Sequence, residues 1–198
     1  MKKTMKKIVA LGSGAVLLVS ASVMGTMAYL TSQDVVTNTF TVGNVAITLD
    51  ETDVDNSQTG QSTIEGRDQA NSYKIFPGQI YTKDPIVHVD SKSEDCWLFV
   101  KVENEIVGIE AKDNNTVADQ MKENGWTVVA ENVYAYNSIA EAGDNKTVFS
   151  QFKIDEGVDN TILATYANKK INVTAYAVQA DGFTTAQAAW EASFGAEN

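Results

Sequence analysis

Apolar and polar residues alternate in short segments along most of this chain. Alternation with a period of two predicts β-strands that bury one face. The strongest such segment is residues 96–106, where one face carries Cys96, Leu98, Val100 and Val102. The opposite face begins with Trp97 and Phe99 and becomes charged towards its end. We therefore expect a strand whose first face lies in the core and whose second face is partly covered.

Other segments have the same character and end at turn residues. Residues 171–178 alternate cleanly, with Ile171, Val173, Ala175 and Ala177 on one face. Further strands are predicted at residues 40–42, 45–49, 73–76, 80–81, 85–90, 126–136 and 146–154. The Pro77-Gly78 and Asp181-Gly182 pairs are typical of turns. Residues 50–72 are polar and are predicted to form an exposed loop.

Two short segments favour helix. Residues 116–125 have Thr116 as N-cap, Asp119 in the first turn and Gly125 as a stop. Residues 184–193 are rich in alanine, with Trp190 as the single large apolar side chain. Many short strands with few helices predict an all-β fold, an antiparallel β-sandwich with one or two short peripheral helices.

The first 28 residues have a different pattern. Four lysines precede an apolar run from Ile8 to Met24, and small residues follow at Thr26 to Ala28. This order is typical of a secretory signal peptide, and we predict cleavage between Ala28 and Tyr29. An uncleaved membrane anchor is the alternative, since the run approaches spanning length. The Gly12-Ser13-Gly14 break favours cleavage. The expected organisation is a signal peptide, 1–28, followed by one secreted domain, 29–198.

Cleavage would leave 170 residues with 11 basic and 26 acidic side chains, a net charge of −15. Such a chain repels phosphate backbones and anionic lipid, so we expect no nucleic-acid partner and no stable membrane insertion after cleavage. The apolar content of 43% is enough for a core.

Residues that could carry catalysis are few. The chain has one histidine, His88, and one cysteine, Cys96, which cannot supply a zinc-ligand set. A triad would need His88 as its base, and no GxSxG segment accompanies it. Cys96 is predicted to be a buried small hydrophobe and His88 a strand-face residue. We therefore predict no catalytic residue and no metal site, and a protein that is not an enzyme.

The densest acidic group is Asp50, Glu51, Asp53 and Asp55. It lacks the spacing and the glycine of an EF-hand loop, so we interpret it as a solvated loop, with weak Ca²⁺ binding as the alternative. No other cofactor is expected. Glu103 and Glu105 are predicted to face solvent.

The segment around the predicted cleavage point resembles the opening of the TasA/camelysin family, secreted proteins of Gram-positive bacteria processed by the SipW-type signal peptidase. The matching residues are Gly25 to Ala28, Tyr29 to Thr31, Asn38 to Thr41, Gly43, and Val45 to Leu49. Looser similarity extends over Pro77-Gly78, Lys83 to Pro85, Cys96 to Val102, Ala175 to Gln179, and Ala188 to Trp190.

The resemblance implies a jelly-roll-like sandwich and a fibre subunit of an extracellular biofilm matrix or cell surface. In that family the N-terminal segment freed by cleavage is thought to complete the sheet of a neighbouring subunit. An exposed sheet edge can accept such a strand, and head-to-tail addition gives a filament. Residues 29–49 are the expected donor segment, and its apolar side chains are Leu30, Val35, Val36, Phe40 and Val42. The expected partners are further copies of the chain, related matrix subunits and the signal peptidase.

Two other functions remain open. A monomeric binding module for glycans or proteins could use Trp97, Phe99 and Tyr176 as an exposed aromatic platform, although such faces more often pack under a helix like that of Trp190. A camelysin-like metalloprotease is the second alternative, for which this sequence offers no zinc-ligand set.

Overall fold

The computed structural model describes residues 44–56 and 64–195. The predicted signal peptide, the Ala28–Tyr29 cleavage point and the apolar donor residues from Leu30 to Val42 lie outside this part of the chain. The described residues belong to one compact unit that starts at Gly43.

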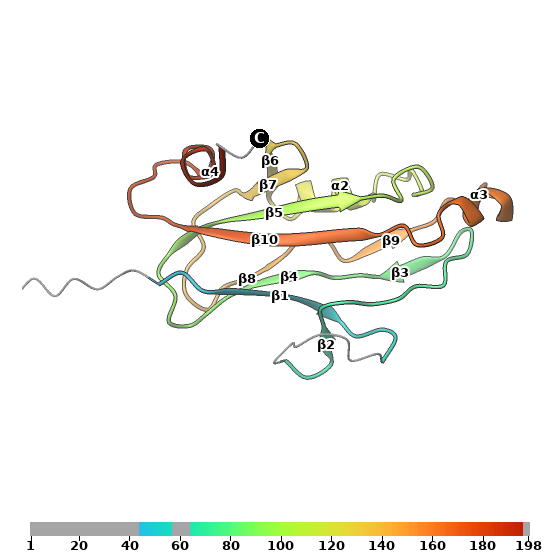
Figure 1. Cartoon of the computed structure of the whole chain (residues 1–198), viewed down its shortest axis with the longest axis horizontal. Coiled ribbons are helices and arrows are strands. Elements are labelled where there is room, and N and C mark those ends of the chain that lie inside the picture. The colour runs from blue at the N-terminus through green and yellow to red at the C-terminus, as the bar shows by residue number, and fades with distance from the viewer. Residues whose placement is uncertain (1–43, 57–63, 196–198) are drawn as a thin grey trace, which may run out of the picture. The chain divides into compact units, whose positions relative to one another are not determined.

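Two four-stranded antiparallel sheets form the body of this unit (Figure 1). The first has the order β2 (Arg67–Asp68), β1 (Ile47–Thr52), β4 (Ile86–Val89) and β8 (Asn145–Thr147). The second has the order β10 (Ile171–Gln179), β5 (Cys96–Asn104), β7 (Val133–Tyr136) and β6 (Trp126–Ala130). A separate pair consists of β3 (Ile80–Thr82) and β9 (Gln151–Lys153). The predicted all-β class is confirmed.

The main core lies between the two sheets. Val87 and Val89 of β4 belong to the same buried cluster as Leu98, Val100 and Val102 of β5. The face predicted for residues 96–102 is therefore the core face. Trp97 and Phe99 point to the other side of β5, into a second and smaller cluster. A strand with both faces covered needs this continuous apolar composition.

In the described part of the chain, three short helices accompany the sheets. α2 (Val117–Glu123) begins at Thr116, whose side chain forms a capping box with Asp119, and Gly125 beyond its end has a φ of +90°. α4 (Ala186–Phe194) begins at Thr185 and contacts all four strands of the second sheet. Both helices were predicted. α3 (Asn160–Thr165) was not, because it buries no side chain and therefore has no apolar period.

Three strand predictions need correction. Residues 146–154 do not form one strand but two, β8 and β9, which belong to different sheets. Residues 73–76 are extended but pair with no strand in the described part of the chain, and Tyr73 packs against Tyr81 and Phe152 instead. Residues 126–136 form the β6–β7 hairpin rather than one strand. Its turn contains Asn132 with a φ of +57°, which asparagine tolerates better than most residues.

The described residues include no helix that is both long and apolar enough to span a bilayer.

Candidate functional site

The most distinctive surface feature is the outer edge of β10. In the described part of the chain this nine-residue strand pairs with β5 alone, over its whole length from Ile171 to Gln179. Figure 1 shows it as the last strand of its sheet, on the side nearest β1. The backbone groups on its other side are a template for a further strand.

The register decides which backbone groups face outward. Lys170 accepts a hydrogen bond from the Glu105 amide, and Ala180 donates one to Asp95, so even-numbered residues of this segment bond to β5. In an antiparallel pair the bonding direction alternates along the strand. The amide and carbonyl groups of Val173, Ala175 and Ala177 therefore point away from β5.

The β10 edge carries none of the usual protection against pairing. Its sequence, INVTAYAVQ, has no charged residue and no proline. Natural edge strands commonly use lysine, proline or a bulge to block addition of a foreign strand. The regular nine-residue register with β5 also shows no bulge. This edge is chemically open to an added strand.

Strand β1 of the other sheet contacts β10 across the body. β2 covers β1 only at Glu51 and Thr52, so Ile47 to Asp50 pair with β4 alone among the described residues. The inward side chains of both strands pack against the main core yet remain only partly buried: Ile47, Leu49, Ile171, Val173, Ala175 and Ala177. The core is thus incompletely covered between these two edges.

A network of ion pairs fixes the far end of β1. The Arg67 guanidinium contacts the Asp50 carboxylate and lies 3.2 Å from Asp84, while His88 Nε2 lies 2.9 Å from Asp50 Oδ1. Asp84 also accepts hydrogen bonds from the amide and hydroxyl of Thr52. Although burial alone would lower it, the hydrogen bonds to Asp50 and Asp84 hold the pKa of Arg67 above its usual value. We call these five residues the Arg67 network.

Glu51 is held in a similar way. Lys83 Nζ lies 2.6 Å from Glu51 Oε2, and Asn71 donates to Glu51 Oε1. The prediction that residues 50–72 form an exposed loop is therefore wrong at its ends, since Asp50, Glu51 and Asp68 are buried. Sequence spacing could not show that Arg67 and Lys83 supply the compensating charges.

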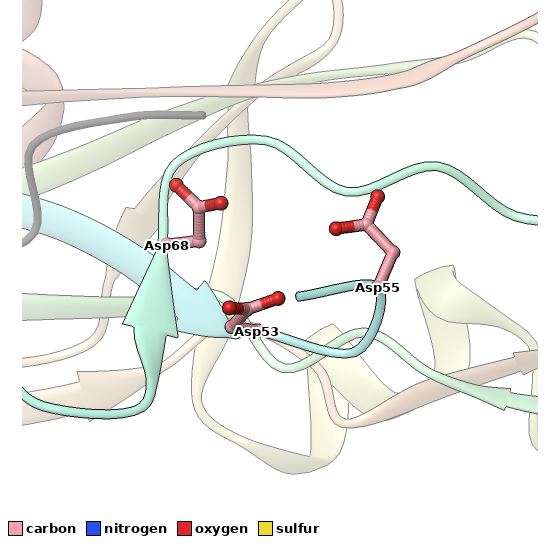
Figure 2. Close-up of side chains that lie close together, drawn as sticks. All are labelled: Asp53, Asp55 and Asp68. Carbon is pink, nitrogen blue, oxygen red and sulfur yellow. The ribbon is translucent and has the colours of Figure 1, made fainter. Parts of the chain in front are cut away.

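The acidic group expected from the sequence is divided in space. Asp50 and Glu51 lie in ion pairs, whereas Asp53 and Asp55 join Asp68, and the three carboxylates lie within 4.8 Å of one another (Figure 2). Figure 2 shows Asp68 on β2, with Asp53 and Asp55 on the segment that follows β1. Carboxylate oxygens are ligands that Ca²⁺ accepts.

Each carboxylate of this trio also has a local role. Asp53 accepts a hydrogen bond from the Asn56 amide, Asp55 from Ser72 and Asp68 from Gln69. These bonds hold the segments on either side of residues 57–63 and account for the convergence of the three side chains.

The single histidine and the single cysteine have structural positions. His88 bridges two neighbouring strands, with Nδ1 near Asn145 Oδ1 on β8 and Nε2 near Asp50 on β1. No serine hydroxyl takes part in these hydrogen bonds. Cys96 is buried, and burial raises the pKa of its thiol to about 11, so it is a poor nucleophile near neutral pH.

The aromatic face of β5 and β10 does not form an exposed platform. Trp97 is 9% exposed and Phe99 is fully buried, and Trp190 of α4 packs against Phe99 and Tyr176. The expectation of an exposed Trp97–Phe99–Tyr176 surface is therefore wrong. Helix α4 packs on this apolar face and covers it.

The predicted donor residues, Leu30, Val35, Val36, Phe40 and Val42, cannot be placed, because they lie outside the described residues. The acceptor edge on β10 was not identified from the sequence. Its signal is present in INVTAYAVQ, a long alternating strand with no charge, but whether a strand lies at an edge depends on topology. No protein family, curated protein or solved structure matches this chain.

Proposed function

We propose that this protein is a secreted, self-assembling fibre subunit with a jelly-roll-like sandwich, in which the N-terminal segment of one copy pairs with the β10 edge of the next. The observation that carries the proposal is the unprotected β10 edge beside an incompletely covered core. The resemblance to the TasA/camelysin family, which rests mainly on residues near the N-terminus, implies the same function.

The β10 edge offers two kinds of interaction to an added strand. Its outward amides and carbonyls can form ladder hydrogen bonds, each contributing about 0.5–1.5 kcal/mol net. The partly buried side chains of β1 and β10 offer apolar area to every second residue of the incoming strand. Backbone pairing supplies affinity, and the apolar contacts fix the register.

Residues 47–49 of the expected donor segment belong to β1 and pair with β4. The donor that we propose is therefore residues 29–42, which have the composition that this edge requires. Residues 29–42 contain apolar side chains separated by threonine, serine and asparagine, and Phe40 and Val42 alternate with Thr39 and Thr41. Removal of the signal peptide would free this segment. Because donor and acceptor lie on different parts of the chain, addition is head-to-tail and does not close, which favours filaments.

The test compares secreted protein beginning at Tyr29 with a shortened chain beginning at Gly43. Negative-stain microscopy and sedimentation should show filaments for the first and monomers for the second. Filaments of unchanged length from the shortened chain would contradict the proposal. N-terminal sequencing of secreted protein should give Tyr29 as its first residue.

A matched pair of variants tests the edge itself. Ala175→Lys places a charge on the side of β10 that faces the core opening, whereas Thr174→Lys places the same charge on its exposed opposite side. We expect Ala175→Lys to suppress filaments and Thr174→Lys to retain them. Far-ultraviolet circular dichroism of both variants shows whether the body still folds. Equal assembly by two folded variants would place the contact elsewhere.

A further inference from the structure

A hollow of about 260 Å³ lies between β5, β7 and α2. Its walls are formed largely by apolar side chains: Val102, Val107, Val117, Met121 and Tyr134. A buried carboxylate, Glu110, lines the same space. We call this space the Glu110 hollow. It does not belong to the β10 edge or to the Arg67 network.

Glu110 is only 4% exposed, yet its known partners are neutral. Oε1 accepts a hydrogen bond from the Val117 amide at 2.7 Å, and Oε2 accepts one from Asn104 Nδ2 at 3.2 Å. An ionised carboxylate can accept about four hydrogen bonds. Its oxygens therefore retain capacity for a further donor.

The charged neighbours increase the demand for a cation. Burial raises the pKa of Glu110, and the nearby carboxylates of Asp119 and Asp113 raise it further. Among the described residues no lysine, arginine or histidine forms an ion pair with Glu110. Lys112 lines the hollow, but it is exposed. A buried carboxylate without a countercharge is costly.

We propose that the Glu110 hollow binds a small alkylammonium group, with the ammonium donating to the Glu110 carboxylate and the alkyl body packed between α2 and Tyr134. The size of the hollow suits a short aliphatic amine. An anion would be repelled by the Glu110 carboxylate.

The test is an NMR titration of the full-length protein with isopentylamine, and with isopentanol as the neutral molecule of the same shape. Isopentylamine should shift the amide resonances of Val102, Val117 and Met121 in a saturable way, and isopentanol should do so at least about tenfold more weakly. Equal affinities for amine and alcohol would overturn the proposal, because the carboxylate would then contribute nothing.

Variants separate the site from the fold. Glu110→Gln keeps the size of the side chain and should weaken amine binding about 10- to 100-fold, as expected for loss of a hydrogen bond with a charged partner. Glu103→Gln removes a nearby exposed carboxylate and should leave binding unchanged. Equal losses of amine affinity in the two variants would mean that only the net charge of the protein matters, and would overturn the proposal.

Three further outcomes test whether the hollow itself binds the amine, whether Lys112 is the recognising residue, and whether the ammonium group can come from a second copy. Ala118→Leu, on an exposed position of α2 that lines the hollow, should obstruct it and weaken binding even if Glu110→Gln failed to fold. Complete loss on Lys112→Gln would assign recognition to that lysine and contradict the proposal. Shifts of the same amides on raising the protein concentration without added amine, abolished by Glu110→Gln, would support the site and assign it to an ammonium group of a second copy.

Discussion

Asp50 and Glu110 are both carboxylates with 4% exposure, but their surroundings differ. Asp50 contacts the Arg67 guanidinium and His88. Glu110 accepts hydrogen bonds from a backbone amide and an asparagine, and the Asp119 and Asp113 carboxylates raise its pKa. Among the described residues, Asp50 is thus a buried acid with a compensating cation, whereas Glu110 is a buried acid that forms no ion pair.

The comparison teaches that burial by itself does not tell what an acidic residue does. A paired buried charge holds segments together, and removing its partner leaves the charge without compensation. A buried acid without a compensating cation lowers the free energy of unfolding, and its carboxylate can still bind a cation. Asp50 is thus part of the scaffold that orders β1, whereas Glu110 is available to a ligand.

The largest expected effect comes from breaking the compensated site. Arg67→Met removes the cation from Asp50 and Asp84 and should lower the free energy of unfolding by about 3–5 kcal/mol. Urea unfolding followed by tryptophan fluorescence measures it. The double variant Arg67→Met with Asp50→Asn should recover part of the loss. A single variant as stable as the parent would show that the Arg67 network does not order β1.

Lys83→Met should have a smaller effect. It leaves Glu51 buried, but Asn71 still donates to Oε1, so the expected loss is about 1–3 kcal/mol. The same urea experiment applies, with Lys92→Met as a control for removing an exposed lysine. A loss as large as that of Arg67→Met would mean that the two ion-pair sites are one cooperative unit.

Glu110→Gln should leave the free energy of unfolding at pH 7 unchanged or raise it, whereas Arg67→Met should lower it. Since the folded-state pKa of Glu110 is raised, the loss of stability from this acid develops as the pH rises from its ordinary pKa to the raised pKa and is complete above it. Below the ordinary carboxyl value of 4.5 the acid is protonated in both states and the advantage of glutamine disappears.

Unfolding of parent and variant at pH 7 and pH 3.5 measures this difference. The expectation is contradicted if the stability advantage of Glu110→Gln over the parent grows on acidification, or if the variant is much less stable than the parent at pH 7. Either result would show that Glu110 already has a cation in the native protein.

The smallest effect is expected at an exposed pair. Lys169 lies 3.2 Å from Glu105 on the surface, where water and salt screen the attraction. Lys169→Ala should leave the midpoint of urea unfolding unchanged within error. A clear loss of stability would mean that exposure does not explain the contrast with the Arg67 network.

Several elements were predictable because their signals are local. The period-two pattern gave the core face of residues 96–102, and Thr116, Asp119 and Gly125 marked the ends of α2. The division of residues 126–136 into a hairpin was missed, since every part of that segment has strand-like composition. The strand predicted at 73–76 does not form, because Tyr73 packs on Tyr81 and Phe152 without backbone pairing.

The candidate sites were less predictable than the fold. The acidic group at residues 50–55 was visible, but its division between ion pairs and the Asp68 trio depends on Arg67 and Lys83. Trp97 and Phe99 could be expected either in solvent or under a helix, and α4 decided between them. Glu110 gave no sequence signal, because an isolated glutamate beside an apolar residue is common in soluble proteins.

The amino-acid sequence by itself determined the β-rich class, the alternating faces of β5 and β10 and the caps of α2, because these depend on neighbours within a few residues. Tertiary structure alone decided that, among residues 44–56 and 64–195, β10 is an edge, Asp50 has a countercharge and Glu110 forms no ion pair. Strand order and charge pairing join residues that are far apart in the chain, and composition does not encode which of them meet.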